Sequence, residues 1–169
     1  DRGSHPRQAR RRGRDRGRVT AAQHIAHFNW ATLRAPVGDE RVAGFVNAVP
    51  KVNALAERSP GFVWRSGTEA ELASAAGWPL FVGNDRLIAS FSVWESPEAL
   101  RAYVYQTVHG AFFRRAEEWF DPEATRGHAL WWVPVGHMPS IVEAWEKVEA
   151  LEAGGPSDAV FTFAQVPAA

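Results

Sequence analysis

The order of strand-like and helix-like segments along the chain is the feature that most limits its fold. Four short segments rich in aromatic and β-branched residues are typical of strands, and they span residues 24–31, 62–65, 86–94 and 128–133. One helical pattern separates the first two segments, and another separates the last two. This β-α-β-β-α-β order predicts an α+β domain of ferredoxin-like type, a split βαβ arrangement with an antiparallel sheet.

The first helix is predicted from apolar residues at i, i+3, i+4 and i+7 spacing, with Asp39 as its N-cap. The stripe consists of Val42, Phe45, Val46, Val49 and Val52. Pro50 lies inside this pattern and should kink the helix or begin a second turn. The segment 59–61 (Ser-Pro-Gly) should end it. Residues 66–85 are rich in Gly and Pro and predict a long hairpin connection, with one helical turn at 69–76.

The second helix has the clearest start in the chain, because Ser96 is a preferred N-cap and Pro97 suits the first helical position. The pattern continues to about Phe120. Its second half, however, presents an apolar face that is rotated by roughly 140° from that of the first half. The change falls at His109-Gly110. We therefore expect a kink or a π-bulge there, an irregularity that often accompanies function.

A third helix is expected to begin at Ser140, with Glu143 completing a capping box, and to end at Gly154-Gly155. Its buried stripe would be Ile141, Ala144, Trp145 and Val148. Residues 160–163 predict a short extended tail. The chain should thus hold one ferredoxin-like domain over residues 21–169, with an extra C-terminal helix.

The predicted strands carry bulky apolar side chains on both faces, although a ferredoxin-like fold places its two main helices on one face only. A large uncovered apolar face is unusual in a monomer. A second copy of the chain would cover it by burying about 800 Å² per partner, which is an ordinary interface. We therefore expect a homodimer in the form of a closed dimeric α/β barrel.

Residues 1–20 form a separate segment that we expect to be a disordered basic arm or the remnant of an expression tag. Eight Arg and two Asp lie within residues 1–18, whereas the rest of the chain is acidic. Nucleic-acid binding is not expected, because the acidic domain offers no basic face to continue such a contact. The chain has no Cys and no apolar run of the roughly 20 residues that span a bilayer. We expect a cytoplasmic protein without a membrane partner.

His109 is the leading candidate for a functional residue, because imidazole can act as an acid, a base or a neutral metal ligand near neutral pH. Tyr105 and Phe113 lie four residues to either side and would share its helix face. The alternative is a histidine that is half-buried beside these rings with its N–H groups satisfied.

Other candidates come from polar residues inside apolar patterns. Asn29 could orient a ligand from the first strand or make an ordinary hydrogen bond, and Asn53 could face a pocket or cap the Pro50 kink. Trp94 and Trp132 could line a cavity for a flat ligand or belong to the core. His24 and His27 should face opposite sides of a strand and cannot share a metal ion. His128 has no assigned role.

Four stretches resemble the bacterial domain-of-unknown-function 3291 family. They are HIAHFNWATLRAPVGD, VNALAERSPGFVWR, FSVWESPEALRAYVYQTVHGAFFRRAEEWF and LWWVPVGHMPSIVEAWEKVEAL. That family looks related to the dimeric α/β barrel superfamily, which includes antibiotic-biosynthesis and haem-degrading monooxygenases. The resemblance implies the fold more strongly than the chemistry. The segment 93–96 (VWES) before the helix looks like the part of haem-degrading monooxygenases that supplies the axial ligand. His109 would match that ligand, and Asn29 would match a polar first-strand residue.

The leading hypothesis is a small-molecule-modifying enzyme of oxygenase-like type, acting in a biosynthetic or catabolic pathway. His109 would act as general base or as haem ligand, so the cofactor is either none or haem. A cofactor-free isomerase or cyclase could use the same base. The hypotheses from other classes are a non-catalytic haem- or ligand-binding dimer and a structural interaction module. No P-loop, dinucleotide fingerprint or hydrolase motif supports the common alternatives.

Overall fold

A computed structural model of the protein describes residues 22–67, 83–105 and 115–167. Its four strands form one antiparallel sheet with the order β2-β3-β1-β4. The strands are β1 (Gln23–Thr32), β2 (Phe62–Arg65), β3 (Leu87–Trp94) and β4 (Arg126–Pro134). Each βαβ crossover therefore skips one strand, as in ferredoxin-like folds. The predicted fold class is confirmed.

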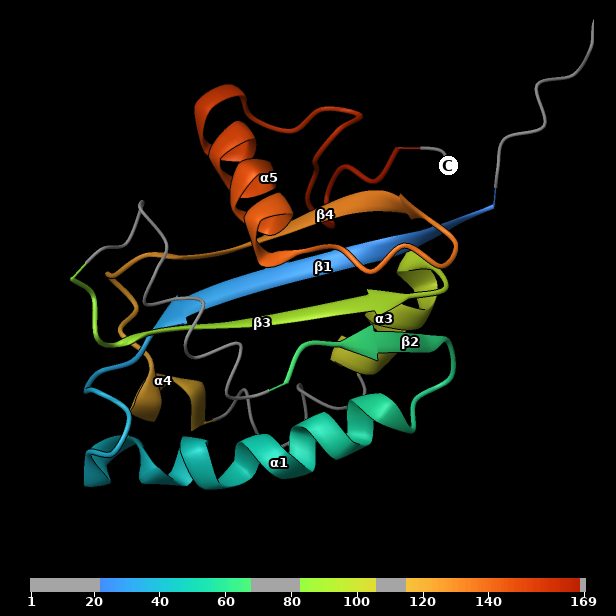
Figure 1. Cartoon of the computed structure of the whole chain (residues 1–169). Coiled ribbons are helices and arrows are strands. Elements are labelled where there is room, and N and C mark those ends of the chain that lie inside the picture. The colour runs from blue at the N-terminus through green and yellow to red at the C-terminus, as the bar shows by residue number, and fades with distance from the viewer. Residues whose placement is uncertain (1–21, 68–82, 106–114, 168–169) are drawn as a thin grey trace, which may run out of the picture.

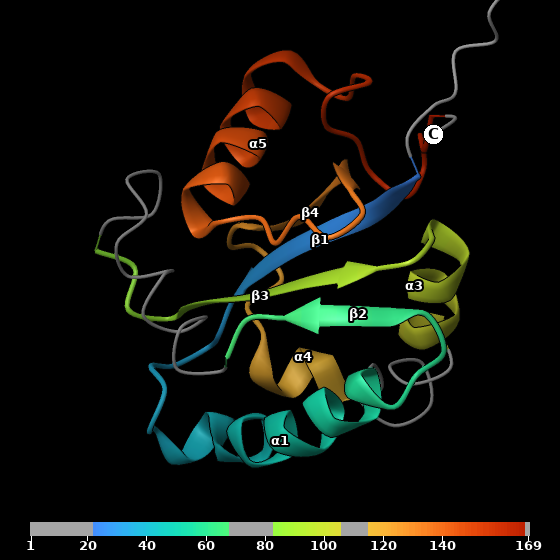
Figure 2. The same ribbon diagram turned by 45° about the vertical axis from the view of Figure 1, so that its right-hand side comes forward.

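Helices cover both faces of the sheet, which lies between two helical layers (Figures 1 and 2). One layer contains α1 (Ala43–Glu57), α3 (Pro97–Tyr103) and α4 (Ala116–Trp119), of which α1 lies at the bottom of Figure 1. The opposite layer contains α5 (Ile141–Gly154). A short 3₁₀ turn, η1 (Glu40–Val42), leads into α1. No described helix is long and apolar enough to cross a membrane.

The predicted helix starts follow from side-chain caps. Asp39 accepts a hydrogen bond from the backbone N–H of Arg41 and so caps η1, from which α1 continues. α1 runs through Pro50 without ending, so no second turn begins there. Ser96 caps α3 by accepting from the N–H of Ala99 at 3.1 Å, with Pro97 in the first turn. The local signals therefore predict these starts correctly.

The second predicted helix appears as two separate helices in the described residues. α3 ends at Tyr103, and Val104 and Tyr105 continue in a π-helical turn. Arg115, with φ −107° and ψ 0°, precedes α4. The predicted break at His109-Gly110 lies outside the described residues. The same is true of the helical turn at 69–76 and of the arm at 1–20.

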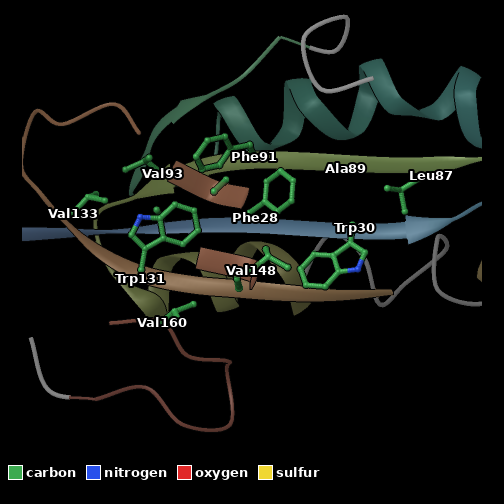
Figure 3. Packing of buried hydrophobic residues seen from close by; sticks show 13 residues of the cluster. Phe28, Trp30, Leu87, Ala89, Phe91, Val93, Trp131, Val133, Val148 and Val160 are labelled. Carbon is green, nitrogen blue, oxygen red and sulfur yellow. The ribbon is translucent and has the colours of Figure 1, made fainter. Parts of the chain in front are cut away.

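The core lies mainly between the sheet and α5, where aromatic side chains from three strands pack together (Figure 3). Phe91 contacts Phe28 edge-to-face at 5.6 Å and lies 5.7 Å from Trp131. The predicted stripe of α5 faces this cluster, with Ala144 and Val148 fully buried. We refer to this side of the sheet as the α5 face.

Glu143 does not complete the predicted capping box. Ser140 Oγ does accept from the N–H of Glu143 at 3.2 Å. The Glu143 carboxylate, however, accepts from Trp131 Nε1 and contacts His137 Nε2, each at 2.8 Å. A buried indole N–H needs an acceptor, and this carboxylate supplies it from α5. Glu143 thereby ties the helix to β4 instead of closing its own first turn.

The position of α5 removes the premise of the dimer argument. That argument assumed an apolar sheet face left uncovered by the single chain. Phe28, Phe91 and Trp131 are only 1%, 2% and 1% exposed without any partner. A second copy is therefore not needed to bury these side chains, because they already pack with the residues of α5. The homodimer itself stays a prediction.

The C-terminal tail adds a short pairing at the free edge of β4. Phe161 and Leu130 exchange two backbone hydrogen bonds of 2.9 and 2.8 Å. Phe161 is fully buried and packs against Trp132. The pairing agrees with the predicted extended tail, and it directs the following residues across the sheet face opposite α5.

Candidate functional site

A cavity of about 990 Å³ lies between the sheet and the helices α1, α3 and α4. We call this side of the sheet the cavity face. Its roof includes most of the predicted apolar stripe of α1, and these side chains are only partly buried. They are Phe45, Val46, Val49 and Val52. The stripe predicts the helix correctly, and in the structure most of its side chains face the cavity.

The floor of the cavity is a band of polar side chains on the sheet. β1 contributes His27 and Asn29, β3 contributes Ser90 and Ser92, and β4 contributes His128. Antiparallel pairing aligns them, since His27 lies opposite Ser92 and Asn29 lies between Ser90 and His128. Directly paired residues share a face of the sheet. The cavity therefore has an apolar roof and a polar floor, a combination typical of small-molecule sites.

His27 is the most unusual residue of the floor, because it is buried and lacks a polar partner. It is 8% exposed, and its ring lies 6.3 Å from the ring of His128 and 5.8 Å from that of Phe163. No hydrogen bond to His27 occurs among the described residues. Burial, with a smaller contribution from His128, lowers the pKa of His27 to about 3. The imidazole is therefore neutral at pH 7 and can accept a hydrogen bond from a ligand.

His128 differs from His27 in that its ring is held by the C-terminal tail. The backbone N–H of Phe163 donates to His128 Nε2 at 3.2 Å, and the Phe163 ring lies 5.1 Å from the imidazole. An Nε2 that accepts leaves the hydrogen of the neutral ring on Nδ1. Burial lowers the pKa of His128 and so favours this neutral form. The ring of His128 is thus held by the tail, whereas the ring of His27 remains available to a ligand.

The predicted residue Asn29 does lie in this site. Its Oδ1 accepts a hydrogen bond from Ser90 Oγ across the β1–β3 pair. Because that bond uses the amide oxygen, the NH₂ group of Asn29 is left without a partner among the described residues. Asn29 can therefore donate to a ligand that lies over His27.

The other predicted site residues divide into three groups. Asn53 and Trp94 line the cavity with Asn29, although Trp94 is fully buried and its Nε1 donates to Ser92 Oγ at 2.9 Å. Tyr105 and Trp132 do not line it; Tyr105 is 59% exposed and Trp132 packs on Phe161. His109 and Phe113 lie outside the described residues. Their roles stay predictions, including that of His109 as a metal ligand.

Sequence reasoning missed the two histidines that the sheet brings together. His27 was considered only as a partner of His24, and His128 received no role. The signal was the alternation itself, because His27 and Asn29 share one face of β1 and an antiparallel β4 places His128 beside them. No group of three or more metal-ligating side chains occurs among the described residues.

The comparisons with solved structures return proteins of low sequence identity. A protein of unknown function, NE2512, from Nitrosomonas europaea has a TM-score of 0.48 and 9% identity, over 72% of this chain and 99% of that one. The cofactor-independent oxygenase SnoaB from Streptomyces nogalater, solved in a mutant form, has a TM-score of 0.44 and 17% identity, over 71% and 100%.

A monooxygenase from the gene ActVA-Orf6 of Streptomyces coelicolor, solved with the ligand nanaomycin D, has a TM-score of 0.43 and 14% identity, over 69% of this chain and 93% of that one. A search of curated proteins finds no significant match. The match to a protein family is much more extensive, since it covers residues 24–169. The chain belongs to the family described as domain of unknown function (DUF3291).

Proposed function

We propose that the protein is an oxygenase-like enzyme that binds a flat, mostly apolar, hydroxyl-bearing molecule in the cavity, with His27 as the proton acceptor. The observation that carries the proposal is the buried, neutral imidazole of His27, which has no partner among the described residues and borders the cavity. The ring nitrogens of His27 are not among the fully buried side-chain atoms without a partner, so a ligand in the cavity can reach them. A ligand hydroxyl that donates to one of these nitrogens would place a removable proton at the base.

With a pKa of about 3, His27 is a weak base on its own, so proton transfer to it depends on the anion that forms beside it. Burial disfavours the imidazolium, so the base is unprotonated throughout the physiological pH range. When the proton comes from a phenolic hydroxyl, the resulting phenolate lies beside the new imidazolium. The two opposite charges then stabilise each other inside the apolar cavity. The NH₂ group of Asn29 can donate to a second oxygen of the ligand and fix its orientation.

A balanced reaction of this kind needs only the ligand and dioxygen. The enol tautomer of an anthrone carries a phenolic hydroxyl, and loss of its proton gives an electron-rich anion. The ring carbon of this anion that is the CH₂ carbon in the keto form then reacts with O₂. One oxygen atom stays on that carbon as a quinone carbonyl, and the other leaves with the two hydrogens as water. The four electrons taken up by O₂ all come from the carbon that is oxidised. No external reductant is required.

The test measures oxygen uptake and quinone formation with anthrone as the substrate. His27→Gln should lower kcat by about 10²- to 10⁴-fold, because the general base is lost. His24→Gln is the matched control: it changes a histidine of the same strand that does not line the cavity, and it should leave the rate unchanged. His109→Ala tests the earlier prediction for that residue in the same assay.

Three outcomes would contradict the proposal. A normal rate in His27→Gln would exclude His27 as the base. Saturable binding of anthrone without any turnover would favour the non-catalytic ligand-binding protein. If anthrone does not bind, the cavity does not take flat aromatic molecules. Haem binding depends on His109 and stays a separate prediction; a Soret shift of added haemin that is lost in His109→Ala would support it.

A further inference from the structure

The polar floor of the cavity extends beyond His27 to the edge of the sheet, where Arg65 of β2 also lines the cavity. Arg65 pairs with Ser92 of β3, and Ser92 pairs with His27 of β1. The three residues therefore form a row across three adjacent strands. Two strand spacings of about 5 Å each separate the backbones of Arg65 and His27. A flat ligand lying along this row would contact both side chains.

A β-bulge in β2 is the reason that Arg65 faces the cavity. The pairing of β2 with β3 shifts register between Phe62 and Trp64. Phe62 packs against Trp94 on the cavity face, whereas Val63 and Trp64 both pack against the cluster on the α5 face. In a regular strand, a residue three positions after Phe62 would point to the opposite face. The bulge reverses this and directs Arg65 to the cavity face, a common use of bulges near sites.

The guanidinium of Arg65 is held in place but keeps donors available. Its Nε donates to Glu57 Oε1 at 2.8 Å, and its Nη1 donates to the backbone oxygen of Ser66 at 2.7 Å. These bonds use two of its five N–H groups. The other three have no partner among the described residues, and the side chain is 20% exposed. A guanidinium positioned in this way is suited to a planar carboxylate, which it can bind through two parallel hydrogen bonds.

We infer that Arg65 forms a carboxylate subsite, so that the molecule bound in the cavity is a hydroxyarene whose acidic group lies at the β2 edge while its hydroxyl contacts His27. This inference rests on the proposed function, because it assumes that the hydroxyl end lies at His27. It adds the charge of the ligand and its direction across the sheet.

The test compares three probes that differ at one end: 6-hydroxy-2-naphthoate, its neutral amide 6-hydroxy-2-naphthamide, and 2-naphthol. Titration calorimetry with the full chain measures their dissociation constants. Wild-type protein should bind the carboxylate more tightly than the amide. Arg65→Met keeps the length of the side chain and removes the charge. It should weaken binding of the carboxylate about tenfold or more, while binding of 2-naphthol changes less than about twofold.

Glu57→Gln separates the subsite from a purely structural role of Arg65. This variant breaks the same ion pair but leaves the guanidinium in place, so it should bind the carboxylate at least as tightly as wild type. An equal loss in Glu57→Gln and Arg65→Met would overturn the inference, because the ion pair alone would then explain the effect. Equal affinity for the amide and the carboxylate would overturn it as well, as would a loss in Arg65→Met that is the same for all three probes.

The failure of the proposed function has a different signature. If His27→Gln leaves the affinity for every probe unchanged while Arg65→Met selectively weakens the carboxylate, the subsite stands and His27 is not the hydroxyl partner. If His27→Gln weakens all probes and Arg65→Met has no selective effect, the proposed function stands and the subsite does not.

Discussion

The two faces of the sheet use the same strands for opposite purposes. On the α5 face, Phe28, Phe91 and Trp131 are almost fully buried and pack ring against ring. On the cavity face, the alternate residues His27 and Asn29 of the same strand border a space of about 990 Å³. The difference shows how a period of two lets one strand contribute to stability on one side and to recognition on the other.

The first prediction removes a large side chain from the packed face. Phe28→Ala should lower the free energy of unfolding by about 3 to 5 kcal/mol, because a buried ring is lost and the surrounding aromatic groups cannot close the space. Val49→Ala on the roof of the cavity should cost less than about 1 kcal/mol, because that side chain already borders empty space. Urea unfolding measures both. Similar losses in the two variants would mean that the two faces are packed alike.

The second prediction uses pH to probe the cavity face. The pKa of His27 is about 3 in the folded protein and about 6.5 in the unfolded chain, so the unfolded state binds the proton more readily. Stability is therefore intact above pH 6.5 and falls as the pH drops towards 3. His27 alone should lower the free energy of unfolding by about 2 kcal/mol between pH 6.5 and pH 5.

His27→Gln should remove this part of the pH dependence and leave the part due to His128, whose pKa is also lowered by burial. The measurement is the free energy of unfolding in urea across this pH range for wild type and variant. Parallel pH profiles for the two proteins would show that the pKa of His27 is not lowered in the folded protein.

The third prediction adds volume to each face. Ala129→Leu on the α5 face should cost about 1 to 3 kcal/mol, because the site is fully buried and has no room. Ala31→Leu lines the cavity and should change stability by less than about 1 kcal/mol while it weakens binding of 2-naphthol. Thermal unfolding and calorimetric titration test the pair. A stability loss in Ala31→Leu as large as that in Ala129→Leu would show that the cavity is already filled.

Local signals predicted the fold well because each acts within a few residues. The cap at Ser96 and the strand at 24–31 depend on neighbours in sequence, and both appear as predicted. The docking of α5 was not predicted, because the stripe that includes Ala144 and Val148 shows that the helix is buried but not on which face of the sheet. Glu143 illustrates the same point, since its carboxylate binds distant Trp131 in preference to its own helix end.

The site was harder to predict than the fold because it depends on contacts between strands. Asn29 was identified from its polar character in an apolar strand. The pairing that brings His128 beside it, however, needs the register of β1 and β4. The position of Arg65 was harder still to predict. Strict alternation from Phe62 places it on the α5 face, and only the bulge directs it to the cavity face. His109, the residue favoured from the sequence, lies outside the described residues.

The contact between Phe163 and His128 has a consequence for the order in which the protein acquires its properties during synthesis. All four strands of the sheet have been translated once Pro134 is added, but the backbone N–H that holds His128 comes from a residue translated after α5. The four strands and α5 can thus pack together before His128 is held in place. The polar floor of the cavity would then be completed after the sheet, by a few residues that follow α5.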